Sequence, residues 1–136
     1  MITEVTKIVD ILKNVINNDN EIDLCILYGS AVKNKLKTNS DIDVVVGHSK
    51  GIHYKKRLDL SIKLSKIIGR EVSLLDIGRM NGLILREVLI KGLTIKNKNP
   101  LYKAKQIIKM LDFVEDILPF QKKCLLKKAR LFAYGK

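Results

Sequence analysis

The chain has 136 residues, of which 46% are hydrophobic and 29% charged, with eight glycines and two prolines. This is the composition of a folded globular domain, and it excludes a disordered, collagen-like or disulfide-scaffold chain. Cys25 and Cys124 lie far apart and in no cysteine or histidine cluster, so we interpret both as small buried hydrophobic residues. Neither a charged leader nor a long uncharged apolar run is present, which predicts a cytoplasmic protein with no membrane contact.

The net charge is +12, and it is unevenly distributed along the chain. Residues 1–50 have a net charge of −1, residues 51–100 of +7 and residues 101–136 of +6. A positive field attracts polyanions, such as a nucleotide, a nucleic acid or an acidic protein surface. A solvated, lysine-rich surface has the same composition, so the charge alone does not choose among these partners.

The first elements are a helix and a buried strand. Thr3 is a suitable N-cap, and apolar residues follow it at helical spacing as far as Ile16, which predicts a first helix. The polar run at 17–20 ends this helix. The apolar stretch at 22–28 then predicts a buried strand, which Gly29 and the serine after it end abruptly.

The middle of the chain continues this alternation. Residues 31–36 have the pattern of one or two helical turns, and residues 41–46 that of a second strand. An amphipathic helix is expected at 54–68, with Gly69 as its C-cap, followed by a third strand at 71–77.

The last part is mostly helical. A helix at 83–91 and a short strand at 93–95 precede a helical region that begins at Pro100 and that Pro119 should kink or split. We expect one apolar stripe of this region to enter the core; it comprises Ala104, Ile107, Ile108, Leu111, Val114 and Leu118. Leu125, Ala129 and Phe132 continue the stripe, but the basic segment after Pro119 is expected to be a surface for an anionic partner or for the acidic face of a toxin. The order of elements predicts an α/β (α+β) fold, a small mixed β-sheet backed by helices.

The strongest chemical signal is a pair of carboxylates at the start of the second strand. Asp41 and Asp43 alternate with Ile42, so both point to the same side of the strand, roughly 7 Å apart. Carboxylates so close repel each other, and a cation between them relieves the repulsion. Their hard oxygen atoms suit Mg²⁺ or Mn²⁺, which take further ligands from substrate phosphates.

A phosphate site is expected beside this pair. Gly29 allows a ligand to approach the backbone closely, Ser30 offers a hydroxyl donor, and a helix N-terminus after them favours phosphate. Lys33, Lys35 and Lys37 lie between the two halves and are suited to balance triphosphate charge. A phosphate cradle next to a metal-binding carboxylate pair is typical of phosphoryl or nucleotidyl transfer.

The segment LYGS, followed by ten residues and then DID and VVV, resembles the GSx10DxD signature of the DNA polymerase beta-like nucleotidyltransferases. Within that superfamily, the chain is most similar to the minimal nucleotidyltransferases (MNT) that act as antitoxins of HEPN toxins. The similarity extends over nearly the whole chain, including the strand at 71–77 and the stretch at 83–101. It implies one nucleotidyltransferase domain at 1–136, with a catalytic core at 1–99 and C-terminal helices at 100–136.

The resemblance also assigns roles to individual residues. Gly29 and Ser30 would hold the phosphates of ATP or another nucleoside triphosphate, and Asp41 and Asp43 would bind divalent ions. The family has a third carboxylate on a later strand, at the position where this chain has Ser73.

Two outcomes at this third position remain open. Either Glu71, on the same strand face, replaces the missing carboxylate as a metal ligand, or the site has two carboxylates and weaker metal binding. Asp76 has the opposite parity and should point away from the site.

Three functions follow from these observations. The first is a metal-dependent nucleotidyltransferase that moves a nucleoside monophosphate, AMP from ATP, to a hydroxyl, which the resemblance identifies as a tyrosine of a partner HEPN toxin. The second is a catalytically weakened antitoxin that neutralises its toxin by binding alone, because Ser73 replaces the third carboxylate. The third, which we do not favour, is a basic protein that associates with nucleic acid through residues 122–130. His48 and His53 are interpreted as polar surface residues.

Overall fold

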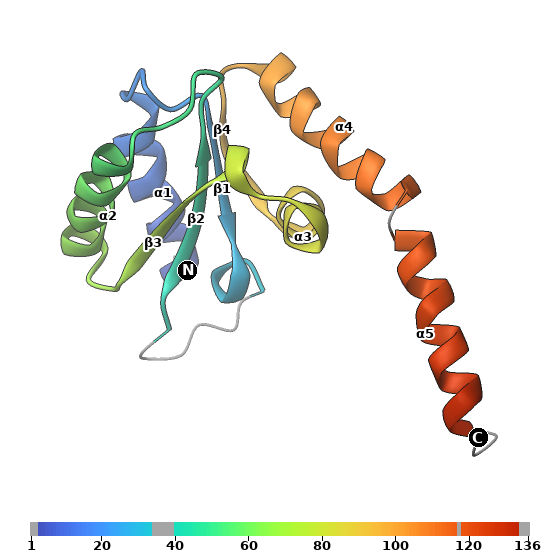
Figure 1. The fold of residues 1–136 in the computed structure, drawn as a ribbon. Helices are drawn as coiled ribbons and strands as arrows, with labels where there is room; N and C mark the ends of the chain where they lie inside the picture. Colours follow the sequence, from blue (N-terminus) through green and yellow to red (C-terminus); the bar gives the residue numbers. More distant parts are fainter. Residues whose placement is uncertain (1–2, 34–39, 117, 134–136) are drawn as a thin grey trace.

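The computed structural model describes residues 3–33, 40–116 and 118–133. Four strands form one mixed sheet in the order β3-β2-β1-β4 (Figure 1). The central strand β1 (Leu24–Tyr28) is antiparallel to β2 (Ile42–Gly47) and to β4 (Leu93–Asn97), whereas β2 is parallel to β3 (Val72–Asp76). The predicted mixed sheet backed by helices is therefore confirmed.

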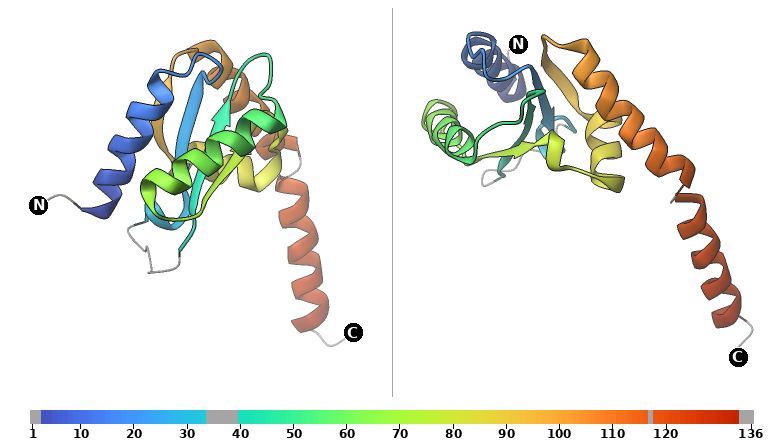
Figure 2. Two further views of the ribbon diagram at one scale, coloured as in Figure 1. Left: turned by 90° about the vertical axis from the view of Figure 1, so that its left-hand side faces the viewer. Right: turned by 45° about the horizontal axis from the view of Figure 1, so that its top comes forward.

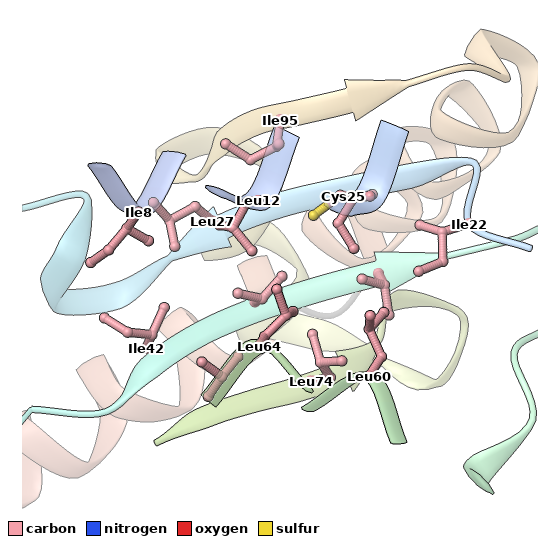
Figure 3. Packing of buried hydrophobic residues seen from close by; sticks show 14 of the residues in the cluster. Ile8, Leu12, Ile22, Cys25, Leu27, Ile42, Leu60, Leu64, Leu74 and Ile95 are labelled. Carbon is pink, nitrogen blue, oxygen red and sulfur yellow. The ribbon is translucent and has the colours of Figure 1, made fainter. Parts of the chain in front are cut away.

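Helices cover both faces of this sheet (Figure 2). Helices α1 (Glu4–Asn17) and α2 (Tyr54–Ile68) lie on one face, and α3 (Gly82–Lys91) and α4 (Pro100–Asp116) on the other. Because strand residues alternate between faces, the sheet contributes to two hydrophobic clusters. The larger cluster lies under α1 and α2 (Figure 3), and its fully buried members include Leu12, Leu27 and Leu64.

Local capping explains where two helices begin and end. The Thr3 hydroxyl accepts a hydrogen bond from the Thr6 N–H at 3.2 Å, as expected for an N-cap of α1. Gly69 ends α2 with a φ of 81°, a left-handed conformation that glycine adopts at little cost. Both helices match the sequence prediction closely.

Several boundaries differ from the prediction by a few residues. Strand β1 begins at Leu24 and not at residue 22, and β3 ends at Asp76, which accepts a hydrogen bond from the Gly78 N–H and caps a short 3-10 helix, η2 (Ile77–Arg79). In place of helical turns at 31–36, the described residues show a 3-10 helix η1 (Gly29–Ala31). The rest of that predicted segment lies outside the described residues.

The predicted core stripe of α4 is only partly confirmed: Ile107 and Val114 are partly buried against the second hydrophobic cluster, but Ala104 and the other described members of the stripe are exposed. The buried residues of α4 are Tyr102, Gln106 and Met110, whereas Ile108 is 57% exposed and Leu111 is 47% exposed. The helix is rotated because Tyr102 fits against Gly47: a Cβ atom at Gly47 would lie 2.7 Å from the Tyr102 ring. A bulky ring over a glycine on β2 determines which face of the helix is buried.

The second C-terminal helix, α5 (Leu118–Ala133), extends away from the sheet (Figures 1 and 2). Helices α4 and α5 are separate elements, as expected from a kink or split near Pro119, and the 66% exposure of Leu125 agrees with the surface expected after this proline. The expectation of two buried cysteines holds for Cys25 alone, because Cys124 is exposed on α5. Among the described residues, no helix is long and apolar enough to cross a membrane.

Candidate active site

The turn after β1 lies directly against the second strand. Gly29 has a φ of 84°, and a Cβ atom at this position would lie 2.7 Å from Oδ2 of Asp43. Any other residue would therefore strain the backbone and collide with the carboxylate. In the strand register, Tyr28 pairs with Asp43, so the glycine turn and the carboxylate meet at one edge of the sheet, as the sequence predicts.

The two aspartates influence each other electrostatically. Asp41 is exposed just before β2, and Asp43 is partly buried within it. The pKa of Asp43 is raised, first by burial and second by the negative charge of Asp41. The predicted like-charge pair is therefore present, and a cation between the two groups would remove the repulsion.

Strand β3 brings Ser73 to the side of Asp43. The two residues are direct partners in the parallel β2–β3 ladder. Glu71 is exposed and lies just before β3, and its backbone carbonyl accepts a hydrogen bond from the Ile42 N–H at 2.9 Å. A serine hydroxyl is thus the nearest β3 side chain in register with Asp43, and the replacement of a third carboxylate by Glu71 stays a prediction. Asp76 lies at the other end of β3, opposite Val46, and so away from Asp43.

Arg70 is a part of this region that the sequence analysis missed. Its Nε atom donates to Oε1 of Glu4 at 2.6 Å, and its Nη1 atom donates to the Ser40 carbonyl at 3.1 Å. The hydrogen bond from Arg70 is the main cause of the lowered pKa of Glu4. Together with the bond from Ile42 to Glu71, this contact fixes the backbone on both sides of Asp41. A lone arginine after a cap glycine has no signal in the sequence that separates it from a surface residue.

The remaining predicted residues differ in how the structure places them. Ser30 is partly buried in η1, and Lys33 is exposed after it. Lys35 and Lys37 lie outside the described residues. Tyr28 packs against the hydrophobic cluster under α3 and α4, which agrees with a structural role.

The side chains around Asp41 and Asp43 determine which cation this site can hold. Among the described residues, no group of three or more histidine, cysteine, aspartate or glutamate side chains could hold a metal ion. Asp41 and Asp43 supply two carboxylates, a set that suits Mg²⁺, because this ion usually keeps several waters and binds substrate phosphates alongside one or two carboxylates. The residues present fit such an ion with the substrate as co-ligand.

A comparison with known families identifies the chain. The family described as "Polymerase beta, Nucleotidyltransferase" matches residues 10–101, which is more than half of the chain and includes the Gly29–Ser30 turn and both aspartates. The chain belongs to the polymerase beta nucleotidyltransferase family. No curated protein matches the sequence significantly.

Solved structures share the fold of this nucleotidyltransferase over nearly its whole length. A toxin–antitoxin structure with AMP-PNP contains a chain that is 20% identical, with a TM-score of 0.69 and coverage of 94% of this chain and 99% of the other. The structure of the toxin–antitoxin MntA-HepT contains a chain that is 19% identical, with a TM-score of 0.62 and coverage of 93% of this chain and 97% of the other. The structure of a tri-AMPylated Shewanella oneidensis HEPN toxin in complex with MNT antitoxin contains a chain that is 17% identical, with a TM-score of 0.65 and coverage of 94% of this chain and 99% of the other.

These similarities include the C-terminal helices, which the family match does not reach. The resemblance to the minimal nucleotidyltransferases, inferred from the GSx10DxD signature, is therefore confirmed at the level of the fold.

Proposed function

We propose that this nucleotidyltransferase moves AMP from ATP to a hydroxyl of a partner protein, a tyrosine of a HEPN-type toxin, and thereby acts as an antitoxin. The observation that carries the proposal is the contact between the Gly29 turn and Asp43, with Asp41 beside it. A phosphate site and a repelling carboxylate pair at one edge of a sheet are the parts that nucleotidyl transfer needs. The Shewanella complex contains an AMPylated toxin, which supports this choice of acceptor.

In this mechanism, Gly29 and Ser30 hold the phosphates of ATP, through a backbone that a ligand can approach closely and through a hydroxyl donor. Asp41 and Asp43 would hold Mg²⁺ or Mn²⁺, which supplies charge neutralisation at the α-phosphate when bound. The acceptor oxygen forms a bond to the α-phosphorus, the bond from that phosphorus to the bridging oxygen breaks, and pyrophosphate leaves. The proton of the acceptor hydroxyl passes to solvent.

A second function is favoured by one observation, the serine beside Asp43. With two carboxylates, a second cation would lose a bridging ligand, and the chain would then neutralise its toxin by binding alone. The two functions share the partner and differ in whether a covalent bond forms.

One experiment tests the proposal and separates the two functions. The protein is incubated with ATP labelled at the α-phosphate, with Mg²⁺ or Mn²⁺, and with the toxin encoded beside it. Transfer predicts label on the toxin and release of unlabelled pyrophosphate, and tyrosine is identified by mass spectrometry. If the toxin is inhibited without any label at any Mg²⁺ or Mn²⁺ concentration, the enzyme proposal is wrong and binding alone is correct.

A further inference from the structure

A cavity of about 760 Å³ lies at the end of the sheet opposite to Asp43. Its walls are residues 20–21 after α1, the loop at 48–53, the end of β3 with the turn η2, and the first part of α4. These segments gather at the upper end of the sheet in Figure 1. The Gly29 turn and the start of β2 lie at the lower end. The cavity is therefore separate from the candidate active site.

Buried polar side chains concentrate at this cavity. Asp23, Asp76 and Gln106 are the only polar or charged residues that are buried among those the structure describes, with 7–8% exposure. Asp76 and Gln106 line the cavity, and Asp23 lies behind the lining residue His48, whose Nε2 atom is 3.7 Å from Oδ2 of Asp23. Gln106 also has an Oε1 atom with no hydrogen-bond partner. Such a concentration is unusual, because buried polar groups cost free energy unless they are satisfied.

The two carboxylates differ in their partners. Oδ2 of Asp23 lies 3.7 Å from His48 Nε2 and accepts from Asn99 Nδ2 at 3.5 Å, and Asp23 interacts electrostatically with Lys96. Within the described residues, neither Asp23 nor Asp76 forms an ion pair with a lysine or an arginine. Asp76 accepts one hydrogen bond, from the Gly78 N–H at 2.9 Å. The Tyr102 hydroxyl lies close to the same place, since a Cβ atom at Gly78 would be 3.2 Å from Oδ1 of Asp76 and 3.3 Å from the Tyr102 oxygen. The inner wall is thus rich in oxygen atoms, and Asp76 supplies its negative charge.

His48 lines the cavity beside Asp23. Its Nδ1 atom accepts a hydrogen bond from the Lys50 N–H at 3.1 Å, and its Nε2 atom lies 3.7 Å from Oδ2 of Asp23. Burial, followed by the charges of Asp76 and Asp23, raises the pKa of Tyr102 to about 12. The tyrosine therefore remains a neutral hydroxyl near two carboxylates.

The exposed part of the lining, which forms the outer wall, has two basic residues, Lys50 and Arg79, against one acidic residue, Glu21. Lys50 and Arg79 line the cavity from the loop and from η2, and both residues are exposed. Neither side chain forms an ion pair with another described residue. A ligand that satisfies both walls must carry a hydrogen-bond-donating cation at its inner end and an anion at its outer end.

We propose that this cavity binds a small zwitterion of the amino-acid class. Its primary ammonium group donates to Asp76 and to the oxygen atoms of Tyr102 and Gln106, and its carboxylate faces Lys50 and Arg79. A metal ion fits less well, because no three of the described acidic or histidine side chains at this cavity are grouped so that they could hold one, whereas three N–H donors match dispersed oxygen acceptors. The volume is within the range of small-molecule sites.

Three probes of matched length test the proposal by calorimetry on the full chain without nucleotide. The zwitterion 6-aminohexanoate carries both charges, hexylammonium only the positive one, and hexanoate only the negative one. L-alanine, whose charges are adjacent, reports whether a free α-amino acid is accepted. We expect 6-aminohexanoate or L-alanine to bind at least about tenfold more tightly than either singly charged probe. Equal affinity for all probes, or no binding at millimolar concentration, would overturn the proposal.

Variants locate the bound probe. Asp76→Asn keeps the oxygen that accepts from Gly78 but removes the negative charge, and should weaken zwitterion binding by about tenfold. Arg79→Gln, at an exposed position that leaves folding unaffected, should weaken it by about threefold. The matched controls are Asp112→Asn and Arg86→Gln, which change the same charges outside the cavity. If zwitterion binding is unchanged in Arg79→Gln and also in Asp76→Asn, and the latter variant is folded, the ligand binds elsewhere and this site is rejected.

Discussion

The Asp41–Asp43 edge of the sheet and helix α5 both concentrate charge of one sign, and they do so in opposite ways. At the sheet edge, strand geometry and hydrogen bonds hold two carboxylates in defined positions against the Gly29 turn. All charged residues of helix α5 are basic, and all are exposed: Lys122, Lys123, Lys127, Lys128 and Arg130.

The two regions differ in how their charges act: the aspartates can coordinate an ion, whereas the lysines of α5 produce a long-range electrostatic potential. Fixed carboxylates can bind one ion at one place, and chemistry depends on ångström-scale placement. Solvated lysines produce a diffuse positive potential that accelerates encounter with an anionic surface but selects no atom. Helix α5 also exposes apolar side chains, with Phe120 67% and Leu125 66% exposed, which suits a helix that becomes covered by a partner. The following expected outcomes test this division, from the largest effect to the smallest.

The largest effect is expected from the carboxylate pair. Asp43→Asn or Asp41→Asn should lower Mg²⁺-dependent transfer of AMP by about a thousandfold or more, because each removes a charged ligand at the reacting phosphate. Transfer of α-labelled phosphate to the partner measures this. Asp10→Asn, the same change at an exposed position of α1, is the matched control and should retain full activity. Full activity of either site variant would remove those residues from the mechanism.

The second effect concerns the position of the third carboxylate. If Glu71 compensates for Ser73, Glu71→Gln should lower transfer by about tenfold or more, and Ser73→Asp should change it modestly. We expect this pattern. The opposite pattern, in which the wild type is nearly inactive, Glu71→Gln is silent and Ser73→Asp restores transfer, would identify an antitoxin that acts by binding alone.

Arg70 should act on catalysis without touching substrate. Arg70→Met removes the hydrogen bond to the Ser40 carbonyl and the ion pair with Glu4, so Asp41 should become less well positioned and kcat should fall about tenfold. Arg70→Lys keeps the charge and should restore part of the rate. Glu4→Gln, which weakens only the ion pair, should have a smaller effect. A kcat unchanged in Arg70→Met would assign this residue to surface stability alone.

The sequence predicted the site better than it predicted the packing of α4. The GSx10DxD spacing is local, and strand alternation translates it directly into geometry, so the meeting of Gly29 with Asp43 could be expected from the residues alone. The buried face of α4 depends on Tyr102 fitting over Gly47, a contact between residues far apart in the chain. From hydropathy alone, Ile108 and Leu111 were predicted to be buried, because the sequence of the helix does not indicate the space above Gly47 of β2 that Tyr102 fills.

The buried polar residues were missed for a related physical reason. Polar side chains in a sequence predict exposure, and only the tertiary structure brings Asp76 and Gln106 together at one cavity, with Asp23 next to its lining residue His48. Arg70 is similar, because its acceptor at Ser40 is 30 positions away. Long-range polar contacts of this kind leave no periodic signal.

Helix α5 should influence the rate of association more than stability. Reversal of four lysines should slow association with the partner by about tenfold or more at low salt and flatten its salt dependence; these are Lys122, Lys123, Lys127 and Lys128. The matched control reverses the same number of exposed charges on α1 and α2, at Lys13, Lys55, Lys63 and Lys66. Equal association rates for the two variants would reduce α5 to a solvated surface. Competition by RNA at low salt would instead favour the nucleic-acid alternative.

The smallest effect is a pH-dependent change in stability at the carboxylate pair. Because the pKa of Asp43 is raised in the folded protein, the folded state binds a proton there more readily than the unfolded chain. The stability of the metal-free protein should therefore fall as the pH rises from the ordinary aspartate range through the raised pKa. Asp43→Asn removes this loss, and above that range it should increase the free energy of unfolding by about 0.5 kcal/mol, a small value because the group is partly solvated. Urea unfolding at two pH values measures the change. With Mg²⁺ added, the wild type should become more stable than Asp43→Asn, since only the wild type retains both carboxylate ligands. If Asp43→Asn is less stable than the wild type without metal, the repulsion between Asp41 and Asp43 is negligible.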